Sequence, residues 1–535
     1  MAALYIALIY ITVLLVTGRL VQQKVKALRS PLSQIPGPWY GPLTTLHLRW
    51  LFSTGEIWKL VERSHARYGP IVRLGPRQVW ISDKAAMRQI LVKNDLPKVA
   101  MYAEISRDKF SPGLFGEIRY EPHKRLKRFL SPAFTVAYID NLETYFKTTV
   151  RDLLDKYQAT IADDPLAAAK NGITVDLMDD LHNVALDIMG ECSFGKGFGQ
   201  TNPDTLVEDG VDEKVWKQIP RSIFDGLSKR YQVRMRRQAS CVRVSLRLPW
   251  RQQTVYVKKF LRKFGFDIQF DWPAEMITAI DAVVTRRKRT SECERRDLLQ
   301  HLIEEGKKPD TGTAMTTRDI VDQMAEILLA GSETTSGTLG CLFLELARTP
   351  DARAKLMASL TPKSFTDYDD DIVTSKTVRT GTDEYEYLEA CLRENLRLHP
   401  IASEMGRRTG NQWVELLGYR LPPHTVVSAS YRDLHRNERY WPQAHRFWPE
   451  RWLPADKREG APAPDLEAYY PFSGGNHSCI GINFAWAEMR MVAANILSRF
   501  DIAEVPGQDI DFRQYITMQF ATGHWKVTLK PRLQQ

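Results

Sequence analysis

The chain opens with an apolar stretch, Met1 to Gly18, that carries no charged side chain. A helix of that length reaches about 27 Å at ~1.5 Å per residue, close to the thickness of a bilayer core. No basic residue precedes it, and it is longer than the apolar part of a cleaved signal peptide. We therefore predict a single-pass transmembrane anchor over 1–18. The basic linker that follows, 19–34, should stay in the cytosol by the positive-inside rule.

After a stiff proline-rich hinge at 35–42, the hydrophobic pattern predicts a mainly helical protein with small β-sheets. Short apolar runs predict strands at 71–75 and 78–82, and helical periodicity dominates from about 85 to 350. Further strands are expected at 413–419, 425–430 and 516–529. No repeat or linker separates two cores, so residues 35–535 are expected to form one domain behind the anchor.

The composition, 43% hydrophobic and 26% charged, is that of a globular protein with a large core. Six widely spaced cysteines show no zinc-site spacing, so most are expected to be reduced thiols in a cytosol-facing protein. The net charge of +10 suits nucleic acid, an anionic membrane or an acidic protein. Because no nucleic-acid motif occurs, we expect no nucleic-acid partner and favour the other two.

One cysteine lies in a glycine-rich loop, Phe472-Ser-Gly-Gly-Asn-His-Ser-Cys-Ile-Gly481. The loop joins a strand-like stretch, 469–472, to a helix that begins near Ile482. Such a loop lets backbone N–H groups turn toward the sulfur and lets the chain approach a porphyrin face without Cβ clashes. The alternative is a buried structural cysteine.

This loop resembles the haem-thiolate loop of the cytochrome P450 monooxygenases, F-x-x-G-x-R-x-C-x-G. The resemblance implies that Cys479 is the axial metal ligand of haem b, that Phe472 shields the sulfur, and that Gly475 and Gly481 make the close approach. His477 replaces the usual arginine, which pairs with a haem propionate. A histidine there can still donate a hydrogen bond, with a charge that depends on pH.

A long helix is predicted from a capping box at Thr316 to about Arg348, and it contains Ala-Gly-Ser-Glu-Thr-Thr at 330–335. A threonine hydroxyl can bond back to the carbonyl four residues earlier, so Gly331 and Thr334 would open a groove that admits dioxygen. The alternative is a glycine-containing packing helix. The segment resembles the family's oxygen-activation motif, which implies that Thr334 hydrogen-bonds the activated oxygen and that Glu333 relays protons.

Glu394 and Arg397 share one face of a helix that Pro400 ends, and Phe-Trp-Pro-Glu-Arg-Trp follows at 447–452. Together they resemble the family's Glu-Arg-Arg triad, with Arg451 as the second arginine. We expect a buried structural network rather than a catalytic one.

A basic helical segment at 123–134 carries His123 and Lys127, where the family has a tryptophan and an arginine that face a haem propionate. Arg407 is a further candidate for a propionate contact. The neighbouring cations Lys124, Arg125 and Arg128 are expected to stay exposed and to dock an acidic redox partner.

Residues 229–263 mix cations with large apolar residues, which suits either a solvated helix face or a surface that touches anionic lipid. By analogy, the substrate pocket is expected to involve residues before Thr334, Ile401 to Met405, and Met518 to Thr522.

These resemblances imply an enzyme that activates O2 and oxidises a small apolar organic substrate. Only 56 residues follow Cys479, too few for a flavin domain, so the electrons are expected from NADPH-cytochrome P450 reductase. The expected location is the endoplasmic reticulum membrane with a cytosolic catalytic domain, in a fungal secondary-metabolite pathway. The alternatives are reductase-independent peroxide rearrangement or dehydration, and a non-enzymatic haem sensor or carrier.

Overall fold

The computed structural model describes residues 2–104, 113–204, 212–220, 274–289, 297–364, 372–381 and 383–532. The chain divides into two compact units. Unit 1 comprises Met1–Val99, Ala402–Ala444 and Asp465–Ser478. Unit 2 comprises Ala100–Ile401, His445–Pro464 and Cys479–Gln535. The amphipathic segment predicted at 229–263 lies outside the described residues.

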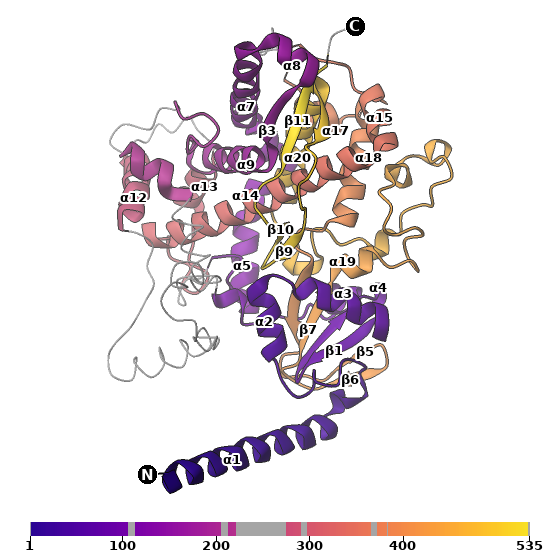
Figure 1. Ribbon diagram of the computed structural model, residues 1–535. Coiled ribbons are helices and arrows are strands. Elements are labelled where there is room, and N and C mark those ends of the chain that lie inside the picture. Colours follow the sequence, from indigo (N-terminus) through magenta and orange to yellow (C-terminus); the bar gives the residue numbers. More distant parts are fainter. Residues whose placement is uncertain are drawn as a thin grey trace. The chain divides into compact units, whose positions relative to one another are not determined.

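Unit 1 is built on a four-stranded sheet in the order β1-β2-β7-β4, in which β2 and β7 are parallel and the other neighbours antiparallel (Figure 1). A separate hairpin pairs β5 with β6. Its helices are α1 Ala2–Arg29, α2 Leu46–Thr54, α3 Ile57–Tyr68, α4 Lys84–Arg88 and α19 Tyr431–His435. Its strands are β1 Ile71–Gly75, β2 Gln78–Ile81, β4 Glu404–Arg408, β5 Val414–Leu416, β6 Tyr419–Leu421 and β7 Val426–Ser430.

Unit 2 is mainly helical, and α14 runs beside α9 through it (Figure 1). Its helices are α5 Tyr120–Leu130, α6 Val136–Asn141, α7 Glu143–Asp163, α8 Pro165–Asn171, α9 Leu177–Phe194, α12 Ala274–Arg289, α13 Leu298–Glu305, α14 Thr317–Arg348, α15 Pro350–Ser359, α17 Ser375–Arg379, α18 Asp383–Leu398 and α20 Ile482–Arg499. Its strands are β3 Ile173–Asp176, β8 Phe500–Glu504, β9 Phe512–Gln514, β10 Met518–Phe520 and β11 Lys526–Pro531. They form a sheet β3-β11-β8 and a hairpin β9-β10.

The predicted class, mainly helical with small sheets, is confirmed, and the strands at 71–75, 78–82 and 425–430 lie within a residue or so of their predicted positions. Two predicted strands are instead pairs of strands. The first, 413–419, is interrupted by Leu417 and Gly418, which have φ values of 50° and 80° and form the tight turn between β5 and β6. The second, 516–529, is broken after β10 by a turn at Gly523, where φ is 76°.

Helix α14 begins as predicted. The Thr316 side chain accepts from the Asp319 N–H, and the Asp319 carboxylate accepts from the Thr316 N–H at 2.8 Å. Among the described residues, α14 is the helix long and apolar enough to cross a membrane, and 67% of its most apolar window is buried. Since its neighbours in unit 2 cover it, this apolar character is that of a core helix.

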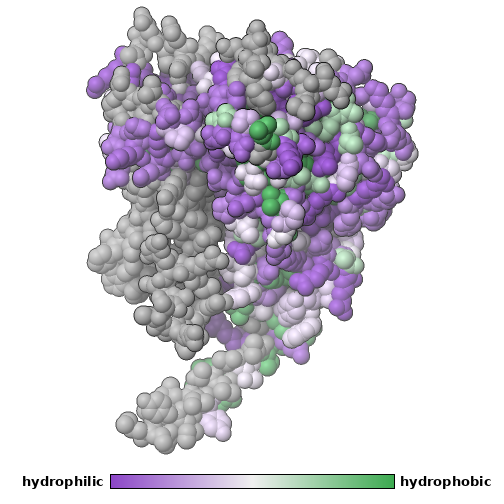
Figure 2. Space-filling view, turned by 45° about the horizontal axis from the view of Figure 1, so that its top comes forward, coloured by the Kyte–Doolittle hydropathy of each residue, from purple (hydrophilic) through white to green (hydrophobic). Residues whose placement is uncertain are grey.

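Helix α1 continues without a break from the apolar stretch through the basic residues to Arg29. Leu14 and Leu15, in the apolar part, are 69% and 68% exposed. The described surface seen in Figure 2 is otherwise largely hydrophilic, with apolar residues scattered over it.

Candidate functional site

Cys479 lies in the last three residues of the glycine-rich loop, 479–481, which belong to unit 2. As a residue it is exposed, whereas the other described cysteines, Cys192, Cys341 and Cys391, are buried. Its sulfur lies among protein atoms, and this desolvation raises the pKa of the thiol. The Gly481 N–H, which donates to the sulfur, and the Lys127 charge both lower the pKa. An exposed cysteine with a backbone donor and a nearby cation fits a metal-binding thiolate better than a buried structural cysteine.

Gly481 lies at the start of α20, which begins at Ile482 as predicted. A Cβ at Gly481 would lie 3.9 Å from Cys479 Sγ, an ordinary contact distance. The strict requirement for glycine is therefore at Gly475 rather than at Gly481.

Gly475 lies in the first half of the loop, in unit 1. Its φ is 69°, and a Cβ at this position would overlap the backbone carbonyl oxygen of Leu91. Only glycine accommodates both conditions. Within unit 1 the backbone that Gly475 approaches closely is that of Leu91, and its approach to a haem stays a prediction.

Phe472 is half-buried in unit 1. The stretch 469–472, which looked strand-like, is a turn in which the Ser473 N–H donates to the Tyr470 carbonyl at 3.1 Å. Ser473 has φ 61°, a conformation incompatible with a strand, and its hydroxyl contacts that of Tyr431 at 2.7 Å.

His477 is buried and bonded through Nδ1 to Asp95 Oδ1 at 3.0 Å, within unit 1. Burial and the charges of Arg407 and Lys98 lower the pKa of His477 to about 4, against the opposing effect of Asp95. In this environment the His477 ring is neutral near pH 7. The change in its charge, and any effect of that change on a propionate contact, is therefore expected at acid pH. A neutral ring that donates to a carboxylate keeps an acceptor at Nε2. Donation to a propionate as well would therefore require the doubly protonated ring.

Arg407 on β4 has hydrogen-bond donors that a propionate could accept, which the neutral His477 ring lacks. The guanidinium is 1% exposed, and among the described residues its buried Nη2 has no hydrogen-bond partner. Nη1 donates to the Gly406 carbonyl at 3.3 Å. Lys98, also buried, lies close enough to act on His477 together with Arg407. A buried guanidinium with an unused donor fits an anionic oxygen group such as a propionate.

Helix α5 carries both residues predicted from the basic segment. His123 is buried and Lys127 half-buried one turn later, so both lie on the inward face. Lys124, Arg125 and Arg128 are exposed, as predicted. The Lys127 charge acts on the Cys479 thiol. The inward face of α5 therefore lies near the start of α20 in unit 2.

Thr334 donates from Oγ1 to the Ala330 carbonyl at 2.7 Å, the bond to the preceding turn that its position predicted. Glu333, beside it on α14, accepts from the Thr517 hydroxyl at 3.2 Å. Burial raises the pKa of Glu333 to about 7, and the Thr517 hydrogen bond lowers it. Glu333 and Thr334 are consecutive residues of α14, and the acid titrates near neutral pH.

Gly331 serves helix packing in this structure. A Cβ at Gly331 would overlap the Met189 sulfur on α9, at the flexible end of that side chain. The alternative of a packing glycine thus applies to Gly331, and the oxygen groove remains a prediction that rests on Thr334.

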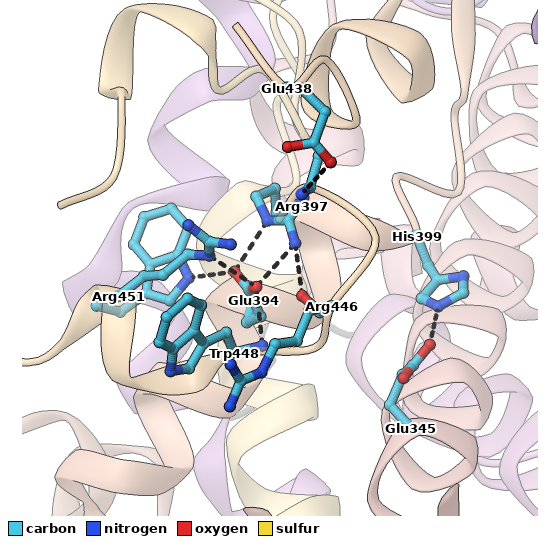
Figure 3. Close-up of polar contacts among 10 residues, drawn as sticks. Glu345, Glu394, Arg397, His399, Glu438, Arg446, Trp448 and Arg451 are labelled. Atoms are coloured by element: carbon cyan, nitrogen blue, oxygen red, sulfur yellow. Dashed lines mark hydrogen bonds and ion pairs between the residues drawn. The ribbon is translucent and has the colours of Figure 1, made fainter. Parts of the chain in front are cut away.

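The Glu394 network, drawn in Figure 3, confirms the predicted buried triad. Arg397 donates from Nε and Nη2 to the two Glu394 oxygens at 2.9 and 2.8 Å, and Arg451 Nε donates to Oε1 at 3.3 Å. Trp452 Nε1 and the Trp448 N–H also donate to this carboxylate, at 2.9 and 3.0 Å. Glu394, Arg397 and Arg451 are all 0% exposed. This geometry ties α18 to residues 445–452 and leaves Glu394 no role at a reacting group.

Two predicted pocket segments meet in unit 2, where the Met518 N–H donates to the Ile401 carbonyl at 2.8 Å. Gln519 lies within the predicted segment Met518 to Thr522, although its partner Glu333 was not predicted. Three further residues act on the site residues and were not indicated by the sequence: Asp95, Lys98 and Thr517. Each stands outside any motif, and each partner lies far away in the chain, 382 positions for Asp95 and His477 and 184 for Thr517 and Glu333. No signal in the sequence alone identifies such pairs.

Comparison with known proteins gives one consistent answer. The family model described as Cytochrome P450 matches residues 31–529. Cytochrome P450 monooxygenase FUS8 of Gibberella moniliformis (strain M3125 / FGSC 7600) is 29% identical over 515 residues, 95% of this chain and 90% of that protein. Cytochrome P450 monooxygenase acrD of Aspergillus aculeatus (strain ATCC 16872 / CBS 172.66 / WB 5094) is 29% identical over 496 residues, 91% of this chain and 88% of that protein.

Among solved structures, the crystal structure of the cytochrome P450DA heme domain matches with a TM-score of 0.70 at 20% identity. The match covers 94% of this chain and 98% of that one. At this identity it shows the fold.

Proposed function

The chain belongs to the cytochrome P450 family, and from that premise we propose that it is a membrane-anchored monooxygenase acting on a small apolar organic substrate. The family makes it an oxidoreductase with haem b, held through a cysteine thiolate. When bound, the haem supplies reductive activation of O2 and transfer of one oxygen atom to the substrate. The other oxygen atom leaves as water, so each turnover consumes two electrons and two protons.

The observation that carries the proposal is the exposed residue Cys479, whose sulfur accepts from the Gly481 N–H and is acted on by the Lys127 charge. Cys479 would hold the iron, and Phe472, Gly475 and Gly481 would shape the loop around it. His123, Lys127 and Arg407 would hold the propionates, and His477 would contribute through its pairing with Asp95.

Glu333 and Thr334 are the residues to which we assign proton delivery. A carboxyl whose pKa is about 7 can release a proton and take one up again at neutral pH. Thr334 follows Glu333 on α14, and its hydroxyl can both donate and accept. Together they would move protons from solvent to the oxygen that leaves as water.

The electrons would come from NADPH-cytochrome P450 reductase. The exposed cations Lys124, Arg125 and Arg128 share α5 with Lys127, whose charge acts on Cys479, so an acidic partner docked there would approach the thiolate side. The similar cytochrome P450 monooxygenases of Gibberella and Aspergillus accord with the resemblance to fungal members, from which a role in fungal secondary metabolism is proposed.

The membrane anchor is proposed from α1. Tyr10, Ile11, Leu14 and Leu15 are all more than half exposed, which is costly in water and favourable in lipid. Trp39, in the proline-rich hinge ten residues after α1 ends, is 81% exposed, as suits an aromatic ring at the membrane interface. The orientation follows from the basic residues after Gly18, which place the catalytic domain on the cytosolic side of the endoplasmic reticulum.

Two variants test the proposal. The reduced protein with carbon monoxide should show a thiolate-type Soret band that is lost in Cys479→Ser, and an unchanged band would refute the ligand assignment.

With reductase, NADPH and a candidate substrate, Thr334→Ala should release more hydrogen peroxide per NADPH consumed. Product formation without reductase, or unchanged coupling in Thr334→Ala, would contradict the monooxygenase reaction.

A further inference from the structure

The carboxyl and the main-chain carbonyl of Glu333 are both held by the β9–β10 hairpin. Thr517, in the turn of the hairpin, donates from Oγ1 to Glu333 Oε2 at 3.2 Å. Gln519, on β10, donates from Nε2 to the Glu333 carbonyl oxygen at 2.8 Å. The same amide lies 3.4 Å from Thr517 Oγ1, so the three residues form one hydrogen-bonded group.

A glycine on α14 makes room for this contact. Gly337 follows Glu333 by one helical turn, and a Cβ there would lie 3.0 Å from Oε1 and 3.1 Å from Nε2 of Gln519. A carbonyl oxygen has two lone pairs, so the Glu333 carbonyl can accept from Gln519 and stay within the helical ladder. The surface of α14 is thus shaped to receive the Gln519 amide.

The hairpin is itself fixed from other directions. Met518 pairs with Gln514 and Phe520 with Phe512 across the two strands. Met518 and Phe520 are buried, and the Met518 N–H donates to the Ile401 carbonyl at 2.8 Å. A hairpin packed in this way can impose an orientation on a side chain of α14, whereas a loose loop could not.

Thr517 also acts on the acid electrostatically. Burial raises the pKa of Glu333 to about 7, and the hydrogen bond from Thr517 opposes that rise because it stabilises the charged carboxylate. Without the hydroxyl, burial would act unopposed and the acid would hold its proton to higher pH.

We propose that Thr517 and Gln519 are positioning residues that hold Glu333 for proton delivery toward Thr334. The inference rests on the proposed function, in which Glu333 relays protons. A proton passes from solvent to a Glu333 carboxylate oxygen and then onward to Thr334, and Glu333 returns to its starting state. The hairpin fixes the acid between these two transfers and touches neither the substrate nor the cofactor in this role.

Thr517→Val removes the hydroxyl and keeps the shape of the side chain. The pH at which Glu333 is half protonated should then rise from about 7 by roughly one unit, the size expected for one hydrogen bond to a charged group. The infrared C=O band of the protonated carboxyl reports this midpoint in the resting, full-length holoenzyme. The band is assigned to Glu333 because it should be absent from the spectrum of Glu333→Gln. The pH profile of peroxide release per NADPH should shift in the same direction.

Two matched variants separate positioning from general structure. Thr517→Ser keeps a hydroxyl and should retain the wild-type midpoint. Thr160→Val removes a hydroxyl on α7 that bonds the Lys156 carbonyl at 3.0 Å, and it should leave the midpoint unchanged. The proposal is overturned if Thr517→Val leaves the midpoint at its wild-type value, or if Thr160→Val shifts it equally.

Gln519→Leu provides an independent test if Thr517→Val yields too little holoenzyme. It should raise peroxide release per NADPH in the wild-type background and add little in the Glu333→Gln background, because its effect passes through Glu333. Equal increases in both backgrounds would overturn the proposal. Failure of the proposed function would show elsewhere, as a wild type without the thiolate-type band or without NADPH consumption.

Discussion

His477 is a buried, neutral imidazole paired with Asp95, and its pKa of about 4 has a consequence for acid stability. The unfolded chain protonates this ring near pH 6.5, above the folded-state pKa, so between these values the unfolded state binds more protons. Stability is therefore lost as pH falls from about 6.5 toward 4. His477→Gln removes this titration and should reduce the loss between pH 7.5 and pH 5 by about 2 kcal/mol.

Urea unfolding of the full-length holoenzyme at the two pH values measures this difference. His524→Gln is a suitable control, because the His524 side chain is 66% exposed. If His477→Gln and the control lose the same stability on acidification, the ring is not the buried neutral group described above.

Gly475 and Gly474 are neighbours that should respond differently to the same substitution. Gly475→Ala places a Cβ against the Leu91 carbonyl at a φ of 69°, a strain that should cost roughly 1–3 kcal/mol. Gly474 has φ −153°, and a Cβ there would lie 3.4 Å from the Tyr470 ring, an ordinary contact. The carbon monoxide difference signal per milligram and the thermal midpoint should fall in Gly475→Ala and hold in Gly474→Ala. Equal losses in the two variants would rule out the steric explanation.

At the scale of elements, the Glu394 network connects α18 to residues 445–452. Glu394→Gln keeps the shape but leaves the Arg397 and Arg451 guanidiniums buried without their counter-charge, which should cost about 3–5 kcal/mol of unfolding free energy. Glu386 lies on the same helix and pairs with Lys457, and these two side chains are 33% and 43% exposed. Glu386→Gln should cost at most about 1 kcal/mol. Urea unfolding midpoints compare the two, and similar costs would contradict a structural network centred on Glu394.

The elements also show what local pattern can and cannot predict. The limits of α14 follow from Thr316, Asp319 and Pro350, because capping and proline effects act within one turn of the chain. The strand predicted at 413–419 fails at Leu417, since nothing in an apolar run reveals a leucine with φ 50°. Motifs were thus enough to predict helix α14, the glycine-rich loop with its cysteine, and the Glu394 network. The partners of Glu333 and His477 depend instead on tertiary packing between distant segments.

At the scale of the whole molecule, the net charge and the apolar residues of α1 support different proposed contacts. The net charge of +10 accords with an anionic membrane surface and with an acidic reductase, and the basic face of α5 concentrates part of it near Cys479. Electron supply should therefore weaken with added salt, as expected for a screened interaction. The proposed membrane anchor rests separately on the exposed apolar positions of α1.

Tyr10 and Ile11 lie at the middle of the proposed anchor 1–18, whereas Leu28 lies between Lys26 and Arg29 on the basic flank of α1. All three are more than half exposed. In a spanning helix, an arginine near the bilayer centre costs about 2.5–3.5 kcal/mol, whereas one at the cytosolic flank costs little. Tyr10→Arg with Ile11→Arg should therefore release the full-length protein from microsomes on alkaline carbonate extraction, and Leu28→Arg should leave it in the pellet. Carbonate would also extract the wild type if α1 only rested on the surface, and that result would contradict a transmembrane anchor.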